Sequence, residues 1–359
     1  MDVMKALEGD TPHLIDEWQS VPSIWDAVRY AADQKSETGR FILTGSATPT
    51  TKGIEHSGTG RIACLSMHTM SLYESGDSDG MVSLADVCNG NDIGTIRVTS
   101  HTIEELIWYV IRGGWPGSIG KSPRVASLIP KQYIDSVIQR DINKIDDVEH
   151  DYIKVIKCLR SLARNESTTA SNATIKKDIE ENDVSSLGIN TVGAYLSAFK
   201  RMFLTNDIEP FSTFLRSPVR IKQSVKRHFC DPSIAVALMR ATGNMLLRDL
   251  RTFGFLFESL ALRDLQIYAE AMEGRLYHYQ DYADNEIDAV IQFDDDSWSA
   301  FEVKLNPNDA DEAAENLKKV NRLFTHNPAK SLAVIVGCGL NAYRRPDGVY
   351  VLPITSLKP

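Results

Sequence analysis

The chain has 359 residues, of which 43% are apolar and 24% are charged, so it can bury the cores of two or three domains and does not resemble a disordered protein. Its formal net charge of −9 argues against a generally basic nucleic-acid binder, although a local basic patch is compatible with it. No apolar run approaches the length of a membrane span, and the 5 cysteines form no CxxC pair. We therefore expect a cytoplasmic protein with reduced thiols and no membrane partner.

The first fifty residues have the pattern strand, helix, strand. A short apolar run at 13–15 ends in Asp16 and Glu17, an amphipathic helix follows, and 41–43 is a second apolar run. This is a βαβ unit, which implies a parallel sheet. Asp-Glu after such a strand is the Walker B pattern, in which Asp holds Mg²⁺ and Glu orients the attacking water. The alternative is a solvated strand end without function.

Polar residues after the second strand would lie at the same edge of that sheet. Thr44 or Ser46 is therefore a candidate sensor of the γ-phosphate. Arg61, at the start of a further expected strand over 61–65, is a candidate arginine finger acting in trans, with an ordinary surface arginine as the alternative.

The stretch GGWPGSIGKS, residues 113–122, superficially resembles the phosphate-binding loop of an ATPase. Gly114 and Gly120 are separated by five residues instead of four, and a helix precedes them where the loop requires a strand. The preceding helix also directs its negative dipole end toward the loop. We predict an interhelical turn, which leaves the 359 residues without a GxxxxGK[S/T] sequence.

The next segment, 77–150, is predicted to be largely helical. A polar connection over 77–99 leads to a helix that Thr102 and Glu105 begin as a capping box. A long helical segment from Pro123 to about Ile145 follows, with Ser122 as N-cap and a kink at Pro130.

Residues 151–230 have the order helix, helix, helix and β-ribbon, which is typical of a winged helix-turn-helix. The expected wing contains no acidic residue over 216–227. Phosphate contacts there would give salt-sensitive, sequence-independent DNA binding, whereas an exposed ribbon or a strand docked on an acidic neighbour is the alternative. The candidate nucleic-acid residues are Arg216, Arg220, Lys222, Lys226 and Arg227.

The last third combines a helix, a hairpin and a carboxylate-lysine pattern. Glu302 and Lys304 alternate on one predicted strand and so share a face, and Asp288 begins the neighbouring strand. Such a cluster can bind Mg²⁺ through Asp288 and Glu302, with Lys304 positioning the hydrolytic water and Glu258 as a further ligand. The metal site requires an odd hairpin register that sets Asp288 opposite Glu302 or Lys304; a symmetric turn sets it opposite Val303. The alternative is a solvated, salt-bridged hairpin.

Several stretches in order resemble the prokaryotic AAA+-type ATP-binding proteins that carry a C-terminal domain of unknown function, number 4143. These stretches are LIDEWQSVPSIWDAVR, FILTGSATP, MSLYESG, IRGGWPGSI, QYIDSVIQRDI, KRHFCDPSIAVALM, GFLFESLALRDLQIYA, NEIDAVIQF and FEVKL. The resemblance implies that Asp16 and Glu17 are Walker B and that the stretch FILTGS is the sensor strand. It further implies a nuclease-like fold around Glu258, Asp288, Glu302 and Lys304.

The expected architecture is α/β and multidomain: a partial parallel-sheet ATPase core, a helical and winged-helix middle, and a PD-(D/E)XK nuclease-like C-terminal domain. Its expected limits are 1–76 for the ATPase core, 77–150 for a lid-like helical region, 151–230 for the winged helix and 231–359 for the nuclease-like domain. Members of the family begin with a strand and a GxxGxGKT-like loop, and this sequence starts after it. We therefore expect either truncation or a remnant, negligible ATP hydrolysis, Mg²⁺ as the cofactor with ATP only if the missing loop exists, and DNA or a protein as the partner. The alternatives are a Mg²⁺-dependent nuclease that acts through the C-terminal site and a non-enzymatic DNA-binding or partner-binding protein.

Overall fold

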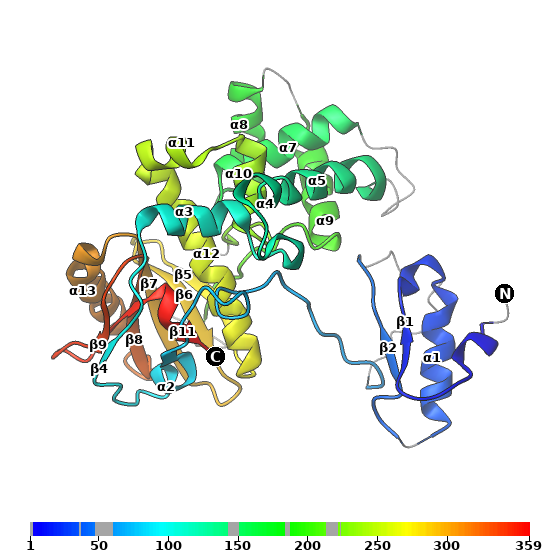
Figure 1. Ribbon diagram of the computed structural model, residues 1–359, viewed down its shortest axis with the longest axis horizontal. Coiled ribbons are helices and arrows are strands. Elements are labelled where there is room, and N and C mark those ends of the chain that lie inside the picture. Colours follow the sequence, from blue (N-terminus) through cyan, green and yellow to red (C-terminus); the bar gives the residue numbers. More distant parts are fainter. Residues whose placement is uncertain are drawn as a thin grey trace.

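The computed structural model describes residues 3–35, 37–46, 60–142, 151–183, 187–212, 222 and 224–359. Figure 1 shows a small N-terminal unit and a larger body, joined by a long extended segment. The larger body consists of a helical region and an α/β region that share the helix α12 (Leu250–Ala271).

The N-terminal unit is the expected βαβ unit. Strands β1 (His13–Ile15) and β2 (Phe41–Leu43) pair in parallel, and α1 (Ser23–Asp33) connects them and covers one face. In this register Leu14 lies beside Ile42, and the two side chains are 62% and 50% exposed. Parallel sheets are normally covered on both faces, so this unit presents an uncovered apolar face. The further strand expected over 61–65 does not form.

The helical region begins with the capping box that the sequence predicts. Thr102 Oγ1 accepts a hydrogen bond from Glu105 N at 3.2 Å, and Glu105 Oε2 accepts one from Thr102 N at 2.8 Å. Pro130 lies in the first turn of a new helix instead of kinking a longer one, where its missing N–H costs no hydrogen bond. The elements are α3 (Ile103–Arg112), η3 (Pro116–Ser118), α4 (Pro123–Ala126), α5 (Ile129–Ser136), the π-helix η4 (Val137–Asp141), α7 (Tyr152–Arg164), α8 (Asn172–Asn182), α9 (Ile189–Arg201), α10 (Pro232–Met239) and α11 (Gly243–Arg248).

Helices α7, α8 and α9 are followed by short antiparallel bridges. These bridges join Thr168 to Arg227, Thr205 to Phe229 and Ile208 to Lys226. The order of three helices and a ribbon agrees with the sequence pattern, and the winged helix itself stays a prediction.

The α/β region is built on a seven-stranded sheet in the order β4-β9-β10-β8-β7-β6-β5. After α12 the chain forms three antiparallel strands, and α13 (Ala310–Asn321) then connects β7 to the parallel strand β8. The strands of this sheet are β4 (Thr95–Arg97), β5 (Arg275–Gln280), β6 (Glu286–Gln292), β7 (Trp298–Lys304), β8 (Ser331–Val336), β9 (Asn341–Arg344) and β10 (Tyr350–Pro353). The last strand of the chain, β11 (Leu357–Lys358), belongs to a separate two-stranded sheet.

The segment expected to be a polar connection over 77–99 belongs to the α/β region. Strand β3 (Val82–Ser83) pairs with β11, α2 (Leu84–Cys88) follows, and β4 (Thr95–Arg97) is the edge strand beside β9. The polar residues there gave no strand signal because β4 is only three residues long and its side chains are largely exposed at an edge.

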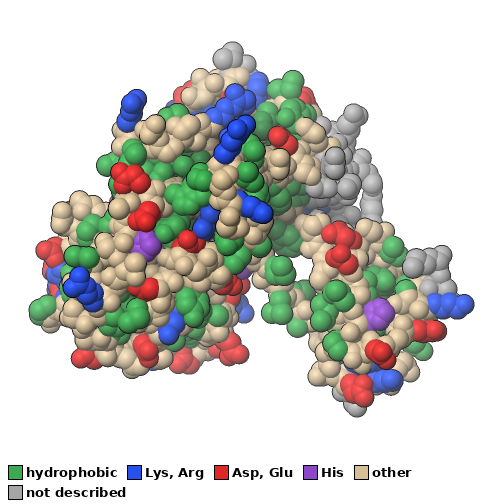
Figure 2. Space-filling model, viewed as in Figure 1, with side chains coloured by type: hydrophobic (Ala, Val, Ile, Leu, Met, Phe, Trp, Pro, Cys, Tyr) green, Lys and Arg blue, Asp and Glu red, His purple; other side chains and the backbone are tan. Residues whose placement is uncertain are grey.

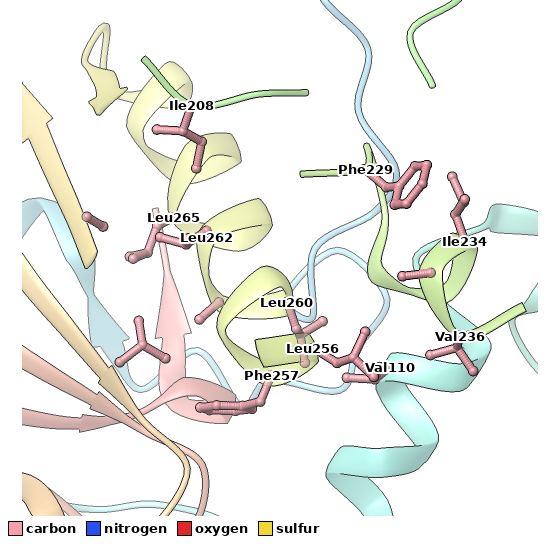
Figure 3. Packing of buried hydrophobic residues seen from close by; sticks show 14 of the residues in the cluster. Val110, Ile208, Phe229, Ile234, Val236, Leu256, Phe257, Leu260, Leu262 and Leu265 are labelled. Carbon is pink, nitrogen blue, oxygen red and sulfur yellow. The ribbon is translucent and has the colours of Figure 1, made fainter. Parts of the chain in front are cut away.

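Helix α12 lies between the sheet and the helical region. Figure 3 shows Leu256 and Leu260 of α12 directed toward Val110 of α3 and Val236 of α10, and Leu262 and Leu265 nearer the strands. One continuous core cluster contains residues of both regions. The helical and α/β regions therefore share a core.

Candidate functional site

The N-terminal unit places its polar residues where the two parallel strands end. Thr44 Oγ1 donates a hydrogen bond to Asp16 Oδ1 at 2.5 Å, and Thr44 N donates to Ile15 O at 2.9 Å. The second bond extends the strand pairing by one residue and so fixes the threonine beside the carboxylate. The sequence therefore correctly placed Asp16 and Thr44 at one sheet edge.

Glu17 and Ser46 lie at the same edge and share a glutamine. Gln19 Nε2 donates to Glu17 Oε2, and Ser46 Oγ lies 3.4 Å from that oxygen. Glu17 itself has a left-handed backbone, with φ 52°. Asp16 offers a carboxylate and Thr44 a hydroxyl, which are oxygen ligands of the kind that Mg²⁺ takes together with water.

Arg61 lies elsewhere on the N-terminal unit. Its guanidinium forms an ion pair with Asp33 at the end of α1, and its side chain is 54% exposed. This pair raises the pKa of Arg61 and lowers that of Asp33 through their shared hydrogen bond. Arg61 could act as an arginine finger only after its ion pair with Asp33 is broken.

The stretch 113–122 is the interhelical turn that the sequence predicts. Gly113 ends α3 with φ 69°, and Gly114 N donates to Asp231 Oδ2 at 2.9 Å. Gly114 O accepts a hydrogen bond from Met70 N at 2.7 Å, and Trp115 Nε1 donates to Ser233 Oγ at 2.9 Å. The turn therefore connects the end of α3 to the start of α10. The backbone N–H of Gly114 donates to the Asp231 carboxylate, so it is not available to a phosphate.

The hairpin β6–β7 has the odd register that the carboxylate cluster requires. Ala289 lies opposite Phe301, so the preceding residue Asp288 is level with Glu302. Asp288 Oδ2 accepts a hydrogen bond from Val303 N at 2.9 Å. Glu302 Oε1 accepts one from Asn316 Nδ2 of α13 at 2.6 Å. Both carboxyl groups are buried.

A lysine ammonium lies among these carboxylates. Lys226 Nζ contacts Glu258 Oε1 of α12 and lies 3.3 Å from Asp288 Oδ1 and 3.6 Å from Glu286 Oε1. The Lys226 side chain is 2% exposed. The sequence pattern did not identify Glu286 as part of this cluster. Glu286 precedes Asp288 by two residues on the same strand, so the two side chains share a face.

Burial and the close charges set the pKa values of this cluster. Burial raises the pKa of Glu258 to about 8 against the opposing attraction of Lys226. Burial also raises the pKa of Asp288, but the attraction of Lys226, together with the hydrogen bonds to Glu302 and Val303 N and the charge of Lys304, outweighs burial and holds that pKa below its usual value. Burial and the adjacent Asp288 raise the pKa of Glu302 well above the ordinary range. Burial lowers the pKa of Lys304, which is half-buried beside the cluster, but the summed attraction of the four nearby carboxylates raises it above its usual value.

These carboxylates would suit a hard divalent cation by their chemistry, but not as they are arranged. Lys226 fills the position among Glu258, Glu286 and Asp288, and both oxygens of Asp288 already have partners. Within the described residues no group of three or more His, Cys, Asp or Glu side chains could hold a metal ion. The arrangement therefore fits an ammonium and does not fit Mg²⁺.

The basic stretch differs from the expected exposed wing. Lys226 is buried in the carboxylate cluster, and Arg227 NH1 donates to Asp207 Oδ2 at 2.6 Å with 13% of its side chain exposed. Lys222 Nζ donates to Asp284 Oδ1 at 2.6 Å and keeps 30% exposure. Arg216 and Arg220 lie outside the described residues. On the face shown in Figure 2, acidic and basic side chains are interspersed over the surface.

Comparison with protein families divides the chain into three matched segments. Residues 2–75 are similar to the family described as "AAA domain", residues 103–245 to a "Domain of unknown function (DUF8612)", and residues 253–357 to a "Domain of unknown function (DUF4143)". The chain thus combines, in an α/β fold, an N-terminal segment similar to AAA domains with a C-terminal segment similar to DUF4143. The second segment extends over both the helical region before residue 150 and the three helices after it.

Two curated relatives match most of this chain. The uncharacterized proteins Mb2031c of Mycobacterium bovis and Rv2008c of Mycobacterium tuberculosis are each 22% identical over 306 residues, which is 84% of this chain and 61% of the relative. The chain thus spans about three fifths of the length of the relatives it matches. No solved structure matches it. In the part of the chain that the structure describes, every helix is too short or too polar to cross a membrane.

Proposed function

We propose that the N-terminal unit supplies the magnesium-binding and water-orienting carboxylates of an ATP-hydrolysing site. Asp16 would hold Mg²⁺ together with the Thr44 hydroxyl, and Glu17 would orient the attacking water. The observation that carries the proposal is the 2.5 Å hydrogen bond between Thr44 Oγ1 and Asp16 Oδ1 at the carboxyl ends of adjacent parallel strands. That edge is where open α/β sheets bind their ligands.

The proposal requires a phosphate-binding loop that the 359 residues do not contain. Two observations support a sheet that is completed by further polypeptide. An isolated two-stranded sheet is marginally stable in water, and the face carrying Leu14 and Ile42 is uncovered. We accordingly propose that the 359 residues alone hydrolyse ATP negligibly.

The first test is the DNA sequence upstream of Met1. An in-frame GxxxxGK[S/T] sequence, roughly thirty to sixty residues upstream by the spacing of a βαβ unit, would supply the loop. The extended protein should then show Mg²⁺-dependent ATP turnover that Asp16→Asn and Glu17→Gln each reduce by about a hundredfold or more. Glu8→Gln, which removes an exposed carboxylate of the same unit, is the matched control and should leave turnover unchanged.

Two results would refute the proposed roles. Turnover in the extended protein that survives Glu17→Gln would place the water-orienting group elsewhere. Turnover by the 359-residue chain itself, lost in Glu17→Gln, would show that no further loop is needed.

A second candidate function is a metal-dependent nuclease in the C-terminal region. It is favoured by Asp288 lying level with Glu302 on the neighbouring strand, beside Lys304, which is the arrangement expected of a PD-(D/E)XK nuclease. Its test is cleavage of plasmid DNA with Mg²⁺ or Mn²⁺ by Lys226→Met, in which the ammonium no longer occupies the cluster. In that background cleavage should be lost on adding Asp288→Ala and kept on adding Asp284→Ala, and cleavage that survives Asp288→Ala would exclude this site.

A further inference from the structure

The lysine in the carboxylate cluster comes from a different part of the fold than the carboxylates. Lys226 lies in the ribbon that follows the three helices, where its N–H and C=O both bond to Ile208 at 2.9 Å. Glu258 belongs to α12, and Glu286 and Asp288 belong to β6. The ribbon therefore inserts a cation into the α/β region from outside it.

The cluster is well matched to an ammonium group. A lysine ammonium has three N–H donors, and three carboxylates surround Lys226 Nζ: those of Glu258, Glu286 and Asp288. A buried lysine is stable only when it is paired in this way, because the lost hydration must be replaced.

The same contacts exclude a second cation. Asp288 Oδ1 faces Lys226, and Asp288 Oδ2 accepts from Val303 N. Glu302 Oε1 accepts from Asn316 Nδ2, so this carboxylate is also engaged. A divalent ion bound by Asp288 would lie beside the ammonium with no water between them to screen the repulsion.

We infer that Lys226 is a built-in counter-cation that keeps this carboxylate cluster free of metal, so that a divalent cation can bind there only when the Lys226 ammonium is absent. The inference rests on the second proposed function, because it names the group that controls metal binding at that site.

The test is Mn²⁺ binding to the full chain, measured by isothermal titration calorimetry and by the shift in melting temperature. We expect wild type to show no binding at this cluster and Lys226→Met to bind one Mn²⁺ there, with a rise in Tm of about 5 °C at saturation. A second substitution, Asp288→Asn, should abolish the new binding. Lys222→Met is the matched control, since Lys222 lies in the same stretch and pairs with Asp284 at the surface; it should behave as wild type.

Removing a buried cation can also prevent folding. If Lys226→Met does not fold alone, its far-UV circular dichroism is measured at increasing Mn²⁺, and recovery of the helical signal that Asp288→Asn abolishes supports the inference. A folded Lys226→Met without Mn²⁺ binding, an unfolded one that Mn²⁺ does not rescue, or wild type that binds Mn²⁺ in an Asp288-dependent way would each overturn it. Mn²⁺ binding without DNA cleavage would leave the inference intact and refute the nuclease proposal.

Discussion

Replacing Arg263 with methionine removes the only guanidinium contact that the described residues make to two fully buried carboxylates. Arg263 NH1 donates to Asp231 Oδ2 at 2.9 Å, and its Nε and NH2 donate to Asp264 Oδ1 at 2.9 and 2.7 Å. Asp231 Oδ2 also accepts from Gly114 N, and Asp264 Oδ2 from Leu72 N. The network thus joins α12 to the start of α10 and to two turns.

The loss of stability in Arg263→Met follows from the two buried carboxylates that the substitution leaves without a cation. Asp231 and Asp264 are 0% exposed, and their backbone partners cannot neutralise their charge. Deleting one partner of a buried pair costs about 3–5 kcal/mol. For a region of this size we expect Tm to fall by roughly 6–15 °C.

The assay is urea unfolding followed by circular dichroism, together with a thermal melt of the same protein. Lys176→Met is the control, because Lys176 forms an exposed pair with Glu180 one helical turn away and should cost less than about 0.5 kcal/mol. A loss below about 1 kcal/mol in Arg263→Met would refute the view that this arginine compensates the two buried carboxylates.

Two further predictions concern burial and backbone packing. Burial raises the pKa of Glu166 to about 8, so the folded state keeps a proton that the unfolded chain releases near pH 4.5. The free energy of unfolding should therefore fall by about 3–5 kcal/mol as the pH rises from about 5 to 8. Glu166→Gln, which has no proton to lose, should abolish this decrease. Urea midpoints at several pH values check this, and a Glu209→Gln curve should parallel wild type. At Gly114 a Cβ atom would lie 2.1 Å from Met70 O, so Gly114→Ala should lower the free energy of unfolding by about 2 kcal/mol or more. At Gly117 the nearest atom to such a Cβ is 3.8 Å away, so Gly117→Ala should change the same urea midpoint very little.

Local patterns predicted much of the fold and part of the candidate site. The βαβ unit, the capping box at Thr102 and the turn at Gly114 depend on neighbouring residues, and the structure confirms all three. The meeting of Asp16 and Thr44 was also predictable, because adjacent parallel strands end at one edge.

Contacts between distant segments could not be predicted in this way. Lys226 lies in a stretch without acidic residues, and its partners Glu258 and Asp288 come from elements 32 and 62 residues later in the chain. Local composition therefore indicated an exposed cation where the fold buries one. The sequence of Thr95–Arg97 has too few apolar residues to predict a strand. The segment is a strand because its backbone pairs with β9, about 250 residues later in the chain, and composition does not indicate such pairing.

Helix α12 supplies the apolar wall for the sheet on one side and for α3 and α10 on the other. A cut on either side of it would leave one fragment with an open apolar surface of the kind that causes aggregation. We therefore expect the helical region and the α/β region to be soluble together and to aggregate when they are expressed apart. A shortened protein should keep α12 together with α3, α10 and the sheet.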